Sequence, residues 1–285
     1  MRWEGRRQSE HIEDRRQLST PTMVGGGLLT LLLMLGLMFL GVDPMQVAGL
    51  APKMMAPTEA PLSPAQKAKS DALAKFVSVV LADNEDVWSK LFPPAFGKRY
   101  ALPTLQLFTG QVQSACGMAS AAAGPFYCPL DKKVYIDLAF YDELKQRFGA
   151  PGDFAQAYVI AHEIGHHVQN QLGISGKVQS MRQKLSDRDY NKLSVRMELQ
   201  ADFLAGVWAH HVARFAGTVD EDDIREAVNA AAAIGDDRIQ KQSQGYVVPD
   251  AFTHGSSEQR VRWFLYGLKT GDPNLMDRAF EVDTP

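Results

Sequence analysis

Three histidines and a glutamate are crowded into six positions of the segment "AHEIGHHVQ", residues 161–169. His162 and His166 are four residues apart, so on a helix they stand one above the other on the same face. Two imidazoles placed in this way can converge on one zinc ion at about 2.0–2.1 Å. Glu163 is turned to one side of the pair, where its carboxylate can take a proton from a metal-bound water. His167 points about a third of a turn away, and we expect it to be a surface or locally hydrogen-bonded residue.

The H-E-x-x-H pattern is typical of zinc metalloproteases, and a catalytic zinc usually has three protein ligands and one open position. The longer pattern H-E-x-x-H-x-x-G-x-x-H does not supply the third ligand, because Gln169 and Leu172 occupy its Gly and His positions. The next candidate is the predicted helix around "RMELQADFLAG", where Glu198 and Asp202 are four residues apart. We predict that Glu198 is the third ligand and that Asp202 accepts the spare N–H of a ligating histidine.

The elements that must position these residues follow from the surrounding pattern. The histidines lie on a predicted helix over 153–172, with Asp153 as its N-cap and Gly173 at its end. Strand-prone segments at 104–113 and 133–137 precede it, and strands followed by helices indicate an α+β domain with a small sheet. Further helices are predicted from Pro64 toward Asn84 and over 139–148, 187–215, 220–234, 256–269 and 273–280. His210 and His211 lie off the line of Glu198 and Asp202, and we expect them to be structural.

The segment from Met23 to Val42 is almost wholly apolar, and no charged residue occurs between Arg16 and Asp43. Twenty residues rise about 30 Å as a helix, which is enough to cross a membrane. We therefore predict a transmembrane helix over 23–42; a cleaved signal peptide is the alternative, although the apolar stretch is long for one.

The charges on either side of this segment predict its orientation. Five arginines precede it, and the first basic residue after it is Lys53. The positive-inside rule predicts a cytoplasmic tail over 1–22, with everything after residue 43 on the outer side. A Pro/Ala-rich linker over 43–63 is predicted to lead to a domain over 64–285.

Cys116 and Cys128 are predicted to form a disulfide, because a domain on the outer side meets an oxidising compartment. The alternative is that both are small buried residues. Their spacing is too wide for a zinc clip. The net charge of −3 shows no basic footprint, so no nucleic-acid partner is expected.

H-E-x-x-H followed by a helix with E-x-x-x-D resembles the gluzincin metalloproteases. The motifs "SACGMA", "GPFYCPLDKKVYID", "AHEIGHHVQNQLG", "ELQADFLAGVWAHH" and "FTHGSSEQRVRWF" are together similar to the bacterial neutral zinc metallopeptidase family. The resemblance covers most of 64–285. It implies a zincin-like fold, mostly helical with a small sheet, that binds one zinc ion and cleaves peptide or protein substrates. With the predicted single-pass anchor, it implies a bacterial inner-membrane protein whose domain faces the periplasm or exterior.

The resemblance also implies further site residues. Many gluzincin-like enzymes have a histidine or tyrosine, beyond the third ligand, that donates to the oxyanion of the tetrahedral intermediate. His254 in "THGSSEQR" is the first candidate for this role and Tyr246 the second; an ordinary loop histidine is the alternative for His254. We expect Arg260 to pair with Asp202. In zincins an edge strand beside the active helix binds the substrate as an added strand, and here it should come from 114–136.

The leading hypothesis is a membrane-anchored zinc endopeptidase with Glu163 as general base. The alternative is a catalytically silent zinc-bearing adaptor or scaffold protein, but a purely structural site has no need of Glu163 beside the metal. An aminopeptidase would need an acidic anchor for the substrate's amino terminus, and the sequence gives no signal for one. The sequence does not specify the substrate or the oligomeric state.

Overall fold

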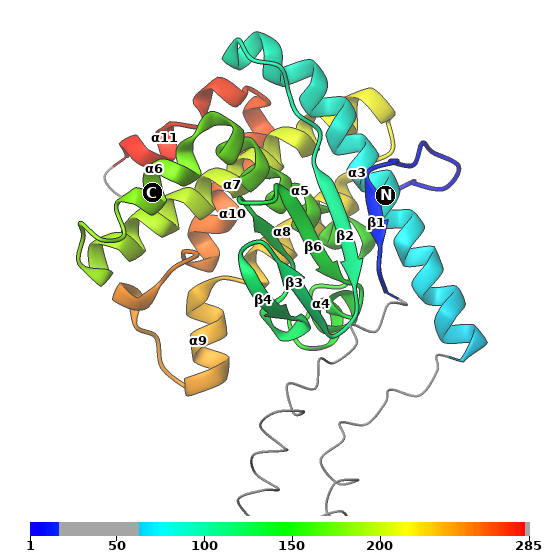
Figure 1. Ribbon diagram of the computed structural model, residues 1–285, viewed down its shortest axis with the longest axis horizontal. Helices are drawn as coiled ribbons and strands as arrows, with labels where there is room; N and C mark the ends of the chain where they lie inside the picture. The colour runs from blue at the N-terminus through cyan, green and yellow to red at the C-terminus, as the bar shows by residue number, and fades with distance from the viewer. Residues whose placement is uncertain (17–62, 283–285) are drawn as a thin grey trace, which may run out of the picture.

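The computed structural model describes residues 1–16 and 63–282, and it confirms the expected α+β fold, mostly helical with a small sheet (Figure 1). A four-stranded sheet has the order β1-β2-β6-β5, and β3 and β4 form a separate two-stranded hairpin. The strands are β1 (Ile12–Asp14), β2 (Thr104–Phe108), β3 (Gln111–Ser114), β4 (Gly117–Ser120), β5 (Phe126–Cys128) and β6 (Lys133–Asp137). β1, β2 and β6 are parallel, and the edge strand β5 runs antiparallel to β6.

Helices make up most of the remaining described chain, with turns and loops between them. They are α3 (Pro64–Phe96), α4 (Phe140–Gln146), α5 (Asp153–Leu172), α6 (Ile174–Ser180), α7 (Asp187–Ala216), α8 (Glu221–Ala233), α9 (Asp236–Gln244), α10 (Ser257–Thr270) and α11 (Arg278–Glu281). Short 3₁₀ turns are η2 (Ala121–Ala123), η3 (Pro249–Ala251) and η4 (Pro273–Leu275). The expected helices over 153–172, 187–215, 220–234 and 256–269 agree with α5, α7, α8 and α10 to within one residue at each end.

Several boundaries differ from the sequence prediction. The expected strand over 104–113 is divided, because Gly110 adopts a left-handed φ of 72° that turns the chain out of the sheet and into the hairpin. α3 continues past Asn84, since Val87, Trp88 and Phe92 extend its buried face. The helix expected over 273–280 is broken into η4 and α11, and α6 and α9 were not predicted.

α5 lies at the centre of the core and packs against α7, α8 and α3. Its N-cap is Gly152 rather than Asp153, which is the first helical residue. The amide of Phe154 instead donates to a Glu226 carboxylate oxygen of α8 at 3.0 Å, so the start of α5 is capped from a neighbouring helix. Gly173 ends α5 in the left-handed conformation, as predicted.

Residues 1–16 of the tail predicted over 1–22 pack against the domain. β1 is hydrogen-bonded to β2, and the Arg6 guanidinium contacts the Asp83 carboxylate of α3 at 2.6 and 2.8 Å. Arg7 contacts Glu85 at 3.1 Å, and the Trp3 ring packs edge-on against Phe76 at 5.6 Å. The positive-inside rule counts the arginines of this segment as membrane-flanking charges, whereas the structure gives three of them, Arg6, Arg7 and Arg16, carboxylate partners on α3.

The transmembrane helix predicted over 23–42 and the linker predicted over 43–63 lie outside the described residues, except for Ser63. Within 1–16 and 63–282, no helix is both long and apolar enough to cross a membrane.

Candidate metal centre

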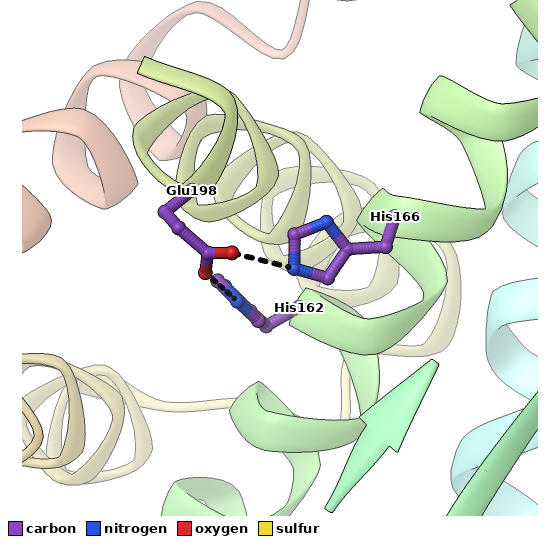
Figure 2. A group of neighbouring side chains, drawn as sticks. All are labelled: His162, His166 and Glu198. Atoms are coloured by element: carbon purple, nitrogen blue, oxygen red, sulfur yellow. Dashed lines mark hydrogen bonds and ion pairs between the residues drawn. The ribbon is translucent and has the colours of Figure 1, made fainter. Parts of the chain in front are cut away.

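Three predicted ligands converge at one point between α5 and α7 (Figure 2). The His162 Nε2 atom lies 3.1 Å from one carboxylate oxygen of Glu198, and the His166 Nε2 atom lies 3.5 Å from the other. Their ligand atoms all lie within 4.8 Å of one another. For zinc with bonds of about 2.0–2.1 Å, tetrahedral ligand atoms would be about 3.4 Å apart, so this donor set fits that ion.

The electrostatic field of the cluster also favours a cation at this point. Burial opposes charge on His162, but Asp202 and Glu198 outweigh it and raise its pKa to about 10. Burial likewise opposes charge on His166, yet Glu198 raises its pKa above the ordinary value. The pKa of Glu198 is lowered well below its usual range, despite burial, by the two histidines. The carboxylate therefore stays ionised and stabilises positive charge at the centre.

Gly165, inside the motif itself, allows the two helices to come this close. A Cβ at this position would lie 3.0 Å from the Ala201 carbonyl oxygen and 3.3 Å from the Ala201 Cβ on α7. Because glycine has no Cβ, the backbone of α7 can pack directly on α5. This contact brings Glu198, one turn before Asp202 on α7, within reach of the histidines.

Asp202 and Arg260 lie behind His162, as expected. The His162 Nδ1 atom is 2.8 Å from Asp202, which can only accept, so this ring nitrogen carries the proton and Nε2 faces the centre. Arg260 of α10 donates to both Asp202 oxygens at 2.9 and 3.0 Å, and the Tyr158 hydroxyl donates to Asp202 at 2.5 Å. Burial raises the pKa of Asp202, but Arg260 and His162 dominate and hold it at about 2. Tyr158 was not predicted, because a tyrosine on the apolar face of a helix carries no sequence signal for this contact.

Glu163 is 8% exposed and lines the same cleft as the three ligands. Burial raises the pKa of its carboxyl group above the usual value, although His166 and His162 oppose the shift. A carboxylate with a raised pKa is a better proton acceptor, as a general base beside a metal requires. His210 and His211 lie away from the centre, where their rings contact the carbonyls of Leu268 and Gly271.

The cleft has a volume of about 870 Å³ and receives side chains from α5, α6, α7, α9, α10 and the β5 edge. His254 lines it and is half exposed, and its Nδ1 atom lies 3.2 Å from the Asp236 carboxylate. This hydrogen bond raises the pKa of His254. Tyr246 is 62% exposed and is not among the residues that line the cleft. The structure therefore brings the first of the two predicted donor candidates to the site and leaves the second outside it.

β5, within the predicted 114–136 region, borders the cleft beside α5. Cys116 and Cys128 form the expected disulfide, which joins the turn between β3 and β4 to β5. His167 was expected to be a surface or locally hydrogen-bonded residue; it is not on the surface, being 1% exposed, but it is hydrogen-bonded. Its Nδ1 atom is 3.0 Å from the Tyr127 hydroxyl of β5 and its Nε2 atom is 2.8 Å from the Ala101 carbonyl. His167 therefore ties the edge strand to the metal-site helix.

Comparison with known proteins agrees with this geometry. Residues 1–279 match the model of a family described as "Putative neutral zinc metallopeptidase". The chain belongs to this family. The match begins at residue 1, so the family model includes the N-terminal segment that carries β1. No solved structure matched the chain.

Relatives of the chain occur in Escherichia coli and in Mycobacterium. The uncharacterized protein YpfJ of Escherichia coli strain K12 is 49% identical over 288 residues, a match that covers 96% of each chain. The uncharacterized protein Rv2575 of Mycobacterium tuberculosis is 42% identical over 261 residues, or 86% of each chain. The likeness thus extends well beyond the short metal-binding motif.

Proposed function

We propose that this protein is a zinc-dependent endopeptidase, and that His162, His166 and Glu198 hold one zinc ion. The observation that carries the proposal is the convergence of these three donors beside Glu163, in a cleft open to a substrate. A zinc ion held there would supply Lewis acidity, polarising a carbonyl and lowering the pKa of water.

The residues around the centre have complementary roles in this proposal. Glu163 takes the proton of the attacking water and delivers it to the leaving amine. His254, held by Asp236, donates to the oxyanion that develops on the scissile carbonyl. Asp202 and Arg260 keep His162 oriented, with its Nδ1 proton directed away from the centre.

The shape and lining of the cleft support an extended peptide as substrate. A volume of about 870 Å³ is large enough for several residues, and the β5 edge can pair with an added strand. The apolar part of the lining, which favours hydrophobic substrate side chains, includes Phe126, Phe140, Phe148, Val159, Ile234 and Ile239.

We also propose attachment to a bacterial membrane through residues 23–42. This part of the proposal depends only on the apolar composition and length of that segment. Extraction of cell membranes at high pH would test it, because an integral segment keeps the protein in the pellet.

The function is tested by comparing wild type with Glu163→Gln. We expect both to bind zinc in equal amounts and only wild type to cleave a peptide library, with at least a ~100-fold lower kcat for the variant, the lower limit for loss of a general base. Wild type free of bound zinc would contradict the metal centre. Zinc in both proteins without cleavage by wild type would contradict the peptidase and favour the adaptor alternative.

A further inference from the structure

The Nδ1 atom of His166, the ring nitrogen that faces away from the metal centre, is hydrogen-bonded to an amide side chain. His166 Nδ1 lies 2.8 Å from Oε1 of Gln169, three residues later on α5. The Gln169 Nε2 atom donates to the Met197 carbonyl at 2.7 Å and to Oε1 of Gln200 at 2.9 Å. The Gln200 Nε2 atom in turn donates to the Met276 carbonyl at 3.1 Å. Both glutamine side chains belong to residues that are fully buried.

Two backbone carbonyls determine the donor and the acceptor in every hydrogen bond of this series. A carbonyl oxygen can only accept, so the Met276 carbonyl requires the amide nitrogen of Gln200. The Met197 carbonyl requires the amide nitrogen of Gln169 for the same reason. The Gln169 oxygen must therefore face His166, and the Nδ1 atom of His166 must be the donor. Nε2 is then the ring nitrogen that faces Glu198 and the metal centre.

We propose that Gln169 and Gln200 are positioning residues that form an amide relay, which runs from the Met276 carbonyl to the metal ligand His166. The relay keeps a proton on Nδ1 of His166 and fixes the orientation of the ring, so that Nε2 is the nitrogen available to a metal. This inference rests on the proposed zinc site. It also gives the segment after α10 a role at that site, because Met276 lies between η4 and α11.

The two histidine ligands are thus oriented by different chemistry. Behind His162 lie an ionised carboxylate and a guanidinium, whereas behind His166 lie two neutral amides. A neutral relay avoids the desolvation cost of a second buried ion pair. It also leaves Glu198 as the negative charge shared by the two Nε2 atoms. The H-E-x-x-H motif gives no signal for this relay, because Gln200 reaches it from another helix.

The relay is tested with three variants of the full chain. Gln169→Met removes the acceptor of the Nδ1 proton, and we expect zinc affinity to fall about 10–100-fold. Gln200→Met should have a smaller effect, because the Met197 carbonyl still holds the Gln169 amide in place. Gln169→Glu keeps an acceptor for His166 but sets a carboxylate against the oxygens of Met197 and Gln200. We expect Gln169→Glu to keep most of the wild-type zinc affinity but to have a lower melting temperature. If Gln169 had a merely structural role, zinc affinity and melting temperature would fall together.

Zinc affinity is measured by chelator competition, independently of peptidase activity. In zinc-loaded protein labelled at histidine, the His166 Nδ1 proton should exchange with solvent faster in Gln169→Met than in wild type. Gln156→Met, on the same helix but outside the relay, is the matched control and should match wild type in both measurements. Equal affinity and equal proton exchange in wild type and Gln169→Met would overturn the relay while leaving the peptidase intact. A wild type without bound zinc would contradict the proposed function itself.

Discussion

At the scale of single residues, His254 is the site residue whose chemistry depends most on its partner. The Asp236 carboxylate contacts the His254 ring and also accepts the backbone N–H groups of residues 253, 254 and 255. These bonds fix the loop that presents the imidazole to the cleft. The hydrogen bond to Asp236 raises the pKa of His254 above the ordinary histidine pKa of about 6.5. The charged ring, which can donate, therefore persists to a higher pH than in a free histidine.

Replacement of His254 by Phe should lower kcat about 10²–10³-fold, the usual cost of losing one oxyanion donor. Zinc content should not change, because His254 is not among the three ligands. Steady-state kinetics on a peptide substrate measure the effect. Tyr246→Phe is the control, and it should keep full activity because Tyr246 lies outside the cleft. A larger loss of kcat in Tyr246→Phe than in His254→Phe would contradict the assignment.

The same pair predicts a pH dependence. A histidine with a raised pKa donates as a cation below that pKa and loses this form as the pH rises through it. Activity should therefore fall as the pH rises above the ordinary range of histidine pKa values. In Asp236→Asn the pKa of His254 should return toward about 6.5, which moves the alkaline limb to lower pH. A pH profile of kcat with an unchanged alkaline limb in Asp236→Asn would show that His254 does not control it.

At the scale of elements, the sequence predicted what depends on the helical repeat and missed what depends on contact between elements. The spacing of His162 and His166 on α5, and of Glu198 and Asp202 on α7, predicted four residues that the structure does bring together. The turn at Gly110, which divides the strand after Thr104, was not predicted, and no local pattern shows that Gln200 meets Gln169. Such contacts depend on where α5, α7 and α10 cross, which is set by packing and not by periodicity.

The crossing of α7 and α10 depends on two glycines. A Cβ on Gly267 would lie 2.0 Å from the Phe203 carbonyl oxygen, and one on Gly206 would lie 2.0 Å from the Phe264 carbonyl oxygen. Neither backbone can move alone without separating the helices. Arg260 precedes Gly267 by two turns on α10. The close contact of α7 and α10 at the two glycines therefore also brings Arg260 within hydrogen-bonding distance of Asp202.

Gly267→Ala should lower the free energy of unfolding by at least about 2 kcal/mol, because the added methyl forces the two helices apart. Urea unfolding of the metal-free protein measures the change. Gly176→Ala on α6 is the matched control for stability: its Cβ would meet nothing within 4 Å, and alanine has the higher helix propensity. The control should be as stable as wild type or slightly more so. Equal stability of Gly267→Ala and wild type would rule out the close backbone contact.

At the scale of the whole molecule, one domain is assembled from two parts of the chain on either side of residues 17–62. β1 joins the sheet beside β2, and Arg16 contacts Ser70 at 2.5 Å and Asp71 at 3.2 Å near the start of α3. A single membrane crossing between residues 16 and 63 would place these two parts on opposite sides of the membrane. The β1–β2 pairing and the topology predicted from the positive-inside rule therefore cannot hold in the same molecule.

The contact between Arg7 and Asp86 decides between the two arrangements, because both side chains are exposed and their charged atoms lie 2.9 Å apart. A full chain with Arg7→Cys and Asp86→Cys, treated in cells with a short bifunctional thiol reagent, should form an internal cross-link. The native cysteines do not compete, since they are already paired. Unfolding in urea before treatment should abolish the cross-link.

The two single variants test the same contact by accessibility. A membrane-impermeant thiol reagent should label Arg7→Cys and Asp86→Cys from the same side of the membrane, because the packed segment and α3 belong to one domain. If Asp86→Cys were labelled from outside and Arg7→Cys only after permeabilisation, the single-crossing topology would stand. Residues 1–16 could not then pack on the domain in the cell.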